Sequence, residues 1–170
     1  MKHILIISGI LIIIIIIIVS QMGLNENIIK KAFKYALSIY PRSIVENAER
    51  IFRLETNHFK SKQFEGTFSA GMEKFSDNFP YGWKTINNIF WEKNPAYKPI
   101  GFKKFIENQT GKTKYFLKFP SFLASLLTLC AFLDYYNNNP GRWFSTNPVS
   151  QNNYNVSIKK IKPYYTNEIF

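Results

Sequence analysis

Residues 43–59, SIVENAERIFRLETNHF, form the stretch from which the fold can be worked out. Their apolar residues recur at spacings of three and four, which predicts an amphipathic helix. Glu55 falls on the same stripe, between Phe52 and Phe59. A carboxylate on an apolar face loses hydration, and burial raises its pKa because the charged form is disfavoured. A glutamate that stays protonated near neutral pH is the group with which a glycosidase protonates a leaving sugar oxygen.

Glu55 has a second interpretation, in which it is a solvated surface residue paired with a cation. Arg50, Arg53 and Lys60 are all close to it in sequence. A helix brings residues three or four positions apart side by side, so such pairs are common on helix surfaces. Periodicity alone does not separate a buried acid from a surface ion pair.

The rest of the pattern predicts a mainly helical chain with a small loop- and strand-containing lobe. Ser43 fits an N-cap, and Glu46 completes a capping box three residues later. Residues 120–136 are apolar nearly all round, and the polar residues that bound them favour a buried central helix over a second membrane span. The other expected elements are a helix over 25–40, an end of the Glu55 helix between 60 and 63, loops with one or two short helices over 64–99, a short helix over 101–108, a strand over 113–119, an extended segment over 142–148 and a helix over 154–162.

The composition is that of one folded, strongly basic domain. The chain has 170 residues, of which 17% are aromatic, and this argues against disorder. A net charge of +11 predicts an anionic partner, such as nucleic acid, phospholipid or an acidic cell-wall polymer. No arginine-rich arm or zinc-ligand array is present, so specific nucleic-acid recognition is disfavoured. His58 has no second histidine near it in sequence, so we predict neither a metal site nor a cofactor.

Residues 1–24 are predicted to form an N-terminal signal anchor, a single transmembrane helix. Residues 4–19 are apolar except for Ser8 and Gly9, and the run through Leu24 reaches the roughly 20 residues that cross a bilayer. A cleaved signal peptide is the alternative. Lysines follow the segment closely, and a positive-inside count would put the body of the protein in the cytoplasm. The function inferred below requires the opposite orientation, and this conflict stays open.

The segment Leu54-Glu55-Thr56, with Ser61 five residues after Thr56, resembles the Glu-Ser/Thr-x-x-x-x-Ser signature of lysozyme-like peptidoglycan hydrolases. In particular it resembles the glucosaminidase family, which includes the flagellar muramidase domain. Three later blocks resemble further motifs of that family in the same order: GTFSAGM at 66–72, YFLKFPS at 115–121, and the stretch 143–161 that begins WFSTNP and contains Tyr154. The resemblance implies an α+β lysozyme-like domain over 43–170, with 25–42 as a helical linker.

The resemblance also implies which residues act. Glu55 would be the general acid, and Tyr154 would stabilise the reacting sugar. The alternative for Tyr154 is a core tyrosine with a bonded hydroxyl. The family's second carboxylate should lie in the poorly matching region after Met72, where Glu92 is at a plausible distance. Asn57-His58 replaces the family's Gly-Trp, and this departure puts catalysis in doubt. The rivals of Glu92 are Glu73, Asp77 and Glu107; the predicted substrate-binding residues are Thr56, Ser61, Phe68, Tyr81, Trp83 and Trp143; and Trp91 is a further candidate for stacking on a sugar.

The sequence therefore predicts three alternative functions. The first is a membrane-anchored peptidoglycan hydrolase, facing the periplasm or cell wall, that cleaves a β-1,4 bond between amino sugars of the glycan strands. Whether it hydrolyses the bond or acts as a lytic transglycosylase stays open, and anionic cell-wall polymers are further expected partners. The second is a non-catalytic, membrane-tethered glycan-binding or structural module with a lysozyme-like cleft. The third, which rests on charge placement alone, is a basic membrane-surface protein facing the cytoplasm.

Overall fold

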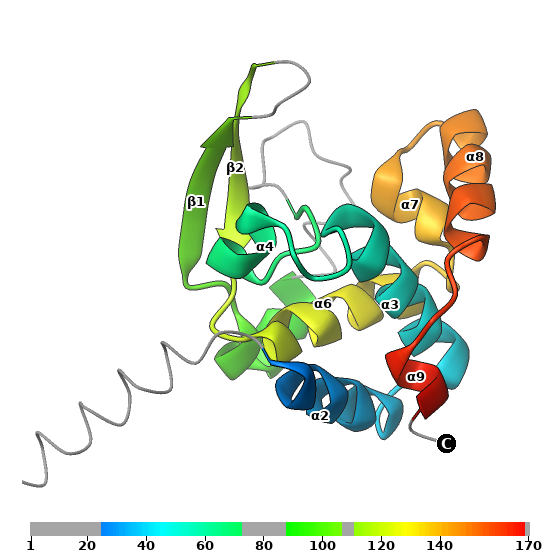
Figure 1. The fold of residues 1–170 in the computed structure, drawn as a ribbon, viewed down its shortest axis with the longest axis horizontal. Helices are drawn as coiled ribbons and strands as arrows, with labels where there is room; N and C mark the ends of the chain where they lie inside the picture. Colours follow the sequence, from blue (N-terminus) through cyan, green and yellow to red (C-terminus); the bar gives the residue numbers. More distant parts are fainter. Residues whose placement is uncertain (1–24, 73–87, 107–110, 169–170) are drawn as a thin grey trace, which may run out of the picture.

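The computed structural model describes residues 25–72, 88–106 and 111–168, which form a mainly helical domain with a two-stranded sheet (Figure 1). A β-hairpin projects on one side of the helices, and α7 and α8 lie on the other side. The labelled elements are α2 (Glu26–Leu37), α3 (Arg42–Glu55), α4 (Lys62–Thr67), η1 (Pro95–Tyr97), β1 (Gly101–Ile106), β2 (Thr113–Lys118), α6 (Phe122–Tyr135), α7 (Pro140–Phe144), α8 (Pro148–Lys159) and α9 (Tyr165–Glu168); residues 88–93 form a further helix.

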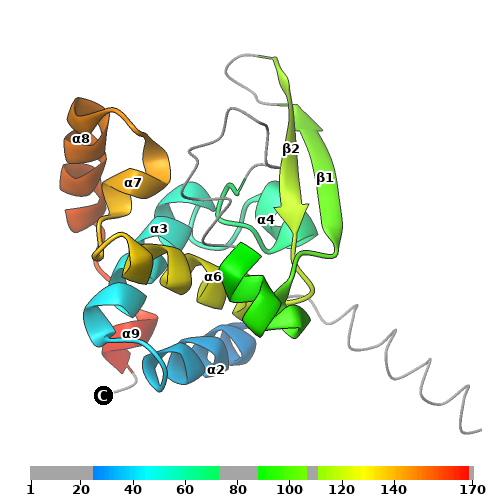
Figure 2. The same cartoon turned by 180° about the vertical axis from the view of Figure 1, so that it is seen from behind.

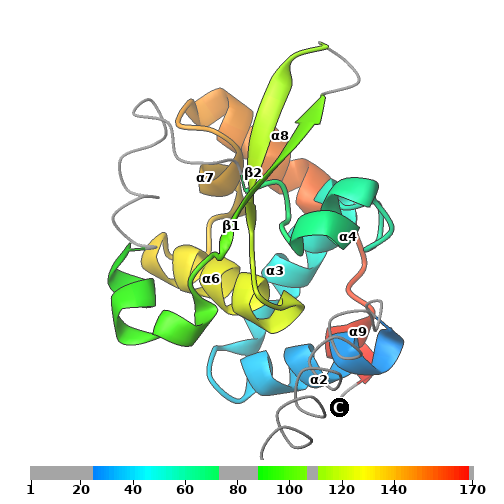
Figure 3. The same ribbon diagram turned by 90° about the vertical axis from the view of Figure 1, so that its left-hand side faces the viewer.

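Helix α6 is the centre of the domain, as its sequence predicted. It is apolar on nearly every side, so it is stable only where other elements surround it. Ser121 caps its first turn, because the serine hydroxyl accepts a hydrogen bond from the N–H of Ala124. Helices α2 and α3 pack against it. Seen from behind, helix 88–93 and η1 cover another side of α6 (Figure 2), and Figure 3 shows α6 between this helix and α3.

A cluster of phenylalanine rings joins α2, α3 and α6. Phe52 of α3 meets Phe122 of α6 edge-on, with ring centroids 5.1 Å apart. Phe33 of α2 meets the same Phe122 ring at 5.7 Å and is completely buried. Edge-to-face pairs of this kind add to the gain from burying the rings. The segment 25–42, predicted as a linker, thus contributes α2 to the core.

The start of α3 differs from the predicted capping box. The helix begins at Arg42, after Pro41, and no side chain caps it. Glu46 instead forms ion pairs one turn away on either side, with Arg42 at 2.8 Å and Arg50 at 3.6 Å. The prediction of Ser43 as N-cap was wrong because proline, with its φ fixed near −65°, already provides a start for the helix.

The end of α3 also differs from the prediction. The helix ends at Glu55, and Asn57, His58 and Phe59 follow with φ between 48° and 69°. Left-handed backbone is costly for residues other than glycine. The turn places the Phe59 ring in the phenylalanine cluster, 5.6 Å from the rings of both Phe64 and Phe122. We infer that this packing offsets the cost of the turn, and that periodicity therefore overestimated the length of the helix.

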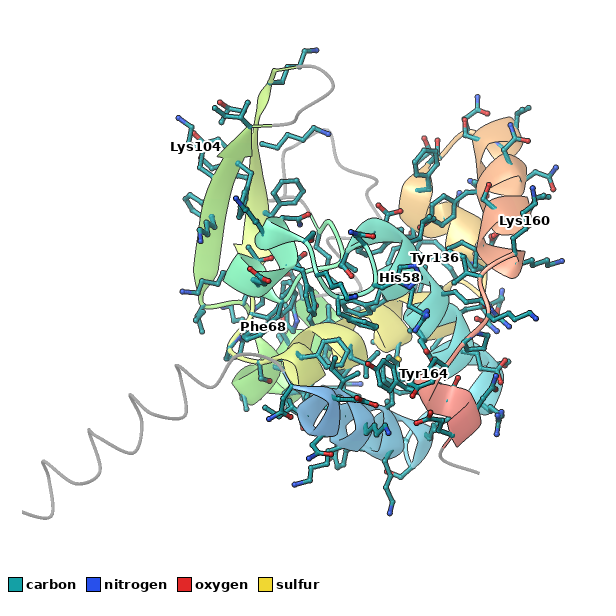
Figure 4. All side chains as sticks on the ribbon, in the orientation of Figure 1. His58, Phe68, Lys104, Tyr136, Lys160 and Tyr164 are labelled. Atoms are coloured by element: carbon teal, nitrogen blue, oxygen red, sulfur yellow. The ribbon has the colours of Figure 1, made fainter. Side chains whose placement is uncertain are left out.

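The strand predicted over 113–119 is confirmed, whereas the short helix predicted over 101–108 is a strand. Strands β1 and β2 pair antiparallel, with Gly101 opposite Lys118 and Ile106 opposite Thr113. The far side of β2 is tied to the loop after α4, because the N–H of Leu117 donates to the carbonyl of Met72 at 2.8 Å. Lys104 lies on the outer side of β1 (Figure 4).

Residues 142–144, the start of a segment predicted as extended or looped, belong to the short helix α7. Asn139 caps it by accepting a hydrogen bond from the N–H of Gly141, and Pro140 occupies the first helical position, where proline is favoured. The helix predicted over 154–162 is α8, which begins six residues earlier, at Pro148. Gly141 lets the two helices approach closely: a Cβ added to it would lie 2.4 Å from the backbone oxygen of Gln151.

We expect the change Gly141→Ala to destabilise the domain by about 1–3 kcal/mol, because a new methyl group would force α7 and α8 apart. Urea unfolding monitored by circular dichroism measures the effect. The matched control is Gly66→Ala in α4, where the added Cβ would meet the flexible end of the Lys103 side chain, and we expect a change of less than about 0.5 kcal/mol. Equal effects of the two substitutions would contradict the close approach of α7 and α8.

No helix within 25–72, 88–106 and 111–168 is long and apolar enough to cross a bilayer. The anchor predicted over residues 1–24 lies outside these ranges.

Candidate functional site

Glu55 is held between three parts of the chain. It is the last residue of α3 and is only partly exposed. One carboxylate oxygen, Oε1, accepts a hydrogen bond of 2.7 Å from the hydroxyl of Tyr154 on α8. The other, Oε2, faces the loop after α4, where a Cβ added to Gly71 would lie 3.9 Å from it. The residue is therefore not the surface ion pair that was the alternative interpretation.

The surroundings of Glu55 favour its protonated form. Burial raises the pKa of the carboxyl group, and the hydrogen bond from Tyr154 lowers it by less, so the net shift is upward. Burial and the nearby Glu55 carboxylate together raise the pKa of the Tyr154 hydroxyl, which therefore keeps its proton. The pair can hold one transferable proton on Glu55 while Tyr154 remains a hydrogen-bond donor.

The turn after α3 is organised by Thr56, which is completely buried. Its hydroxyl donates to the carbonyl of Phe52 and accepts from the N–H of Phe59 at 2.9 Å. Its carbonyl accepts from the N–H of Ser61 at 2.9 Å. Ser61 in turn caps α4. Both residues thus shape the backbone beside Glu55, and contact of Ser61 with a substrate stays a prediction.

His58 lies in this turn, is exposed, and carries a positive φ of 56°. Figure 4 shows it near the end of α3. Its backbone N–H donates to the carbonyl of Arg53 at 2.9 Å, which closes the turn. Both residues of the Asn57-His58 pair therefore adopt a left-handed backbone.

The loop between α4 and residue 72 lies next to Glu55. Phe68 ends α4 with a left-handed φ of 56° and is partly buried against Phe64. The hydroxyl of Ser69 accepts from the N–H of Met72 at 2.7 Å, and this tight turn contains Gly71 at a φ of 83°. A side chain at Gly71 would strain the turn, and its Cβ would lie in ordinary contact with Oε2 of Glu55, at 3.9 Å.

An exposed aromatic ring adjoins the site, and the sequence analysis did not single it out. Phe144, at the end of α7, stacks on Tyr154 with centroids 4.8 Å apart and planes 9° from parallel. It is 60% exposed, so it presents apolar surface next to the Glu55–Tyr154 pair. Its neighbour Trp143, predicted to bind substrate, is partly buried and meets Phe132 of α6 edge-on at 5.8 Å. The sequence feature that could have identified Phe144 is its position next to Trp143, as one of two adjacent aromatic residues.

The structure does not bring every predicted residue to Glu55. Glu92 is exposed on helix 88–93, on the far side of α6 from α3 (Figure 3), and this position does not favour it as the second carboxylate. Trp91 is buried, and its indole N–H donates to Thr128 of α6 at 3.1 Å, so it belongs to the core. Outside the described residues lie Glu73, Asp77, Tyr81, Trp83 and Glu107.

We expect the change Tyr154→Phe to raise the pKa of Glu55 further. The phenol's hydrogen bond favours the ionised carboxylate, so its removal leaves burial unopposed. A titration of side-chain carboxyl ¹³C signals by NMR, with Glu55→Gln used for assignment, measures the shift. The matched control is Tyr115→Phe on the exposed hairpin, which should leave the Glu55 titration unchanged. A lower or equal pKa in Tyr154→Phe would contradict the hydrogen bond.

Comparison of the chain with protein-family models, with curated proteins and with solved structures found no match.

Proposed function

We propose that the protein is a membrane-anchored peptidoglycan hydrolase that cleaves a β-1,4 glycosidic bond between amino sugars, with Glu55 as the general acid. The observation that carries the proposal is the partly buried Glu55 carboxyl group, whose pKa is raised by burial and which is fixed by the 2.7 Å hydrogen bond from Tyr154. A protonated glutamate at a partly open position can give its proton to a leaving sugar oxygen.

The two oxygens of Glu55 suit different tasks. Oε1 is occupied by the Tyr154 hydroxyl, so the proton would be delivered from Oε2, which faces Gly71. Protonation of the bridging oxygen would accompany cleavage of its bond to the anomeric carbon and leave an oxocarbenium-like centre. Water activated by a second carboxylate, the substrate's own N-acetyl group, or a hydroxyl of the sugar would then complete the reaction. The first two routes give hydrolysis, and the third gives a transglycosylase product.

The arrangement of the resembling blocks in space supports the family assignment. The block 54–61 carries Glu55 and its turn, the block 66–72 carries Gly71, and the block 143–161 carries Tyr154. The remaining block, 115–121, is bonded to the second one through Leu117 and Met72. Three of the four stretches thus meet at one carboxyl group, and the fourth is bonded to one of them.

The location of the protein is part of the same proposal. Residues 1–24 would anchor it, and the domain would face the periplasm or cell wall, because that is where glycan strands are found. The net charge of +11 suits a polymer that carries carboxylates or phosphates. The exposed ring of Phe144 would contact a sugar beside the scissile bond.

The experiment is cleavage of purified sacculi by the full-length chain, followed by mass analysis of the soluble products. Hydrolysis yields fragments with a new reducing end, and the identity of the terminal amino sugar shows which bond was cut. Internal attack yields fragments that are lighter by one water. Release of either product by the unmodified chain, but not by Glu55→Gln, supports the proposal. No release from sacculi of several wall chemistries contradicts it.

The second candidate is a non-catalytic glycan-binding module. The position of Glu92 on the far side of α6 favours it, as does the Asn57-His58 pair in place of Gly-Trp. It predicts that the protein sediments with sacculi and that Glu55→Gln sediments equally well, without soluble products in either case.

A further inference from the structure

An asparagine-rich cavity lies where α3, the turn after α6, and α8 meet. Its volume is about 300 Å³, which is within the range of small-ligand pockets. Asn47, Asn138, Asn139, Asn152 and Lys159 contribute to its lining, and none of the described residues that line it is Asp or Glu. The cavity therefore contains one fixed positive charge and many amide groups.

Arg50 fixes the orientation of the Asn47 side-chain amide, which begins a first series of hydrogen bonds between asparagines. Its guanidinium Nη1 donates to Oδ1 of Asn47 at 2.8 Å, and arginine has no acceptor atom. The amide nitrogen of Asn47 must therefore point the other way, and it donates to Oδ1 of Asn138 at 3.0 Å. Because Oδ1 of Asn138 accepts this bond, its Nδ2 group is the donor that remains at the end of the series.

A backbone N–H group fixes the side-chain amide orientations in a second series of hydrogen bonds. Gly141 donates to Oδ1 of Asn139 at 3.1 Å and to Oδ1 of Asn155 at 2.7 Å. Asn155 then donates through Nδ2 to Oδ1 of Asn139 at 2.8 Å. Both oxygens are fixed as acceptors, so Asn139 also has a free Nδ2 group. Among the residues that the structure describes, neither this group, nor Nδ2 of Asn138, nor the Lys159 ammonium has a protein partner.

We propose that this cavity binds an oxyanion, a carboxylate or phosphate group of a larger ligand. The lining residues Asn138, Asn139 and Lys159 provide two amide NH₂ groups and an ammonium group that have no protein partner in the described part of the chain. Sugar hydroxyls need acceptors as well as donors, but a carboxylate or phosphate accepts only, and hydrogen bonds from a cation to an anion are the stronger kind. The site is separate from Glu55 and does not depend on the glycosidase proposal.

The spacing of the lining residues on α8 supports one continuous binding face. Asn152, Asn155 and Lys159 recur at intervals of three and four, so they share a side of the helix. Tyr154 lies on the same helix and donates to Glu55. Helix α8 would thus present one side to the bound oxyanion and another to the acid.

The experiment is a titration of the full 170-residue, ¹⁵N-labelled chain with inorganic phosphate and, separately, with sodium acetate. Ionic strength is held constant with sodium chloride. We expect saturable shifts of the side-chain NH₂ signals of Asn138 and Asn139. Saturation by phosphate alone identifies a phosphate-bearing ligand, and saturation by acetate as well identifies a carboxylate-bearing one. Lys159→Gln should weaken binding about tenfold, whereas the matched control Lys160→Gln, one residue further along (Figure 4), should not change it.

A second variant keeps the fold and reverses the chemistry of the cavity. Asn139→Asp retains the oxygen that accepts from Gly141, and aspartate is as good an N-cap as asparagine. It removes the free N–H donor and adds a negative charge, so oxyanion binding should be lost while the helical content is unchanged. Shifts no larger than those with chloride alone, equal effects of the Lys159 and Lys160 changes, or undiminished binding by Asn139→Asp would each overturn the proposal.

Discussion

The change Glu55→Gln should lower glycan cleavage by about 10²–10⁴-fold, which is the usual contribution of a general acid. Glutamine has nearly the same size and can still accept the hydrogen bond from Tyr154, but it has no acidic proton to give to the bridging oxygen. The loss should appear in the rate of product release from sacculi, with little change in sedimentation with the same sacculi. Those two readings separate proton donation from binding.

The same change should raise stability at neutral pH. Burial raises the pKa of Glu55 in the folded protein above its value in the unfolded chain. Stability is therefore fully present below the unfolded pKa and falls as the pH rises through the folded one, because the buried carboxyl group must then ionise. Glutamine does not ionise, so we expect the variant to gain about 0.5–2 kcal/mol at pH 7. Below the unfolded pKa the gain should disappear.

The control for both readings is Glu65→Gln, which removes an exposed carboxylate from α4. It should leave the cleavage rate and the pH dependence of unfolding close to those of the unmodified chain. If Glu55→Gln is instead less stable at pH 7, the pKa of Glu55 is not raised in the folded protein, and the general-acid assignment is wrong. Unchanged cleavage by Glu55→Gln would exclude the mechanism directly.

Local properties of the sequence predicted the helical framework well. Helix α6 was predicted because it is apolar on nearly every side, and α2 because its apolar residues follow a helical period. Strand β1 was mistaken for a helix because its state depends on pairing with β2, whose register no local pattern specifies. The end of α3 was misplaced for a similar reason, since the position of Phe59 is decided by rings from other elements.

In the candidate site, too, local features could be predicted, whereas contacts between distant parts of the chain could not. The period of one helix places Glu55 on the apolar stripe of residues 43–59, but that period alone did not distinguish a buried acid from a surface ion pair. Its partner Tyr154 is 99 positions away, and only the family resemblance pointed to it. Gly71 reaches the site through a turn with a φ of 83°, and Phe144 through the end of the short helix α7. The sequence analysis therefore singled out Glu55, Tyr154 and the block 66–72, but not the adjoining ring of Phe144.

Glu49 is the buried carboxylate that the sequence analysis did not single out. It is one turn before Arg53 on α3, completely buried, and its side chain receives four hydrogen bonds from the C-terminal segment. The donors are the backbone N–H groups of Tyr164, Tyr165 and Thr166 and the hydroxyl of Thr166, at 2.6–2.9 Å. These groups are 115–117 positions away along the chain, so no local pattern marks the residue.

This contact fixes α9 between α2 and α3, as Figure 1 shows. Tyr165 of the same segment stacks on Phe33 with centroids 5.6 Å apart, and Figure 4 places Tyr164 beside α9. Loss of the Glu49 carboxylate would leave three backbone N–H groups without an acceptor and loosen one side of the phenylalanine cluster. A buried donor without a partner costs about 1–3 kcal/mol.

We therefore expect Glu49→Gln to destabilise the domain by about 3–5 kcal/mol, because its amide NH₂ would face N–H donors instead of accepting from them. Urea unfolding measures the loss, and amide hydrogen exchange at Tyr165 and Thr166 should become much faster. The matched control is Glu46→Gln on the same helix, where two surface ion pairs contribute no more than about 1 kcal/mol. If the two variants unfold at the same urea concentration, the C-terminal segment is not held by Glu49, and the packing of α9 against α3 must come from its aromatic rings alone.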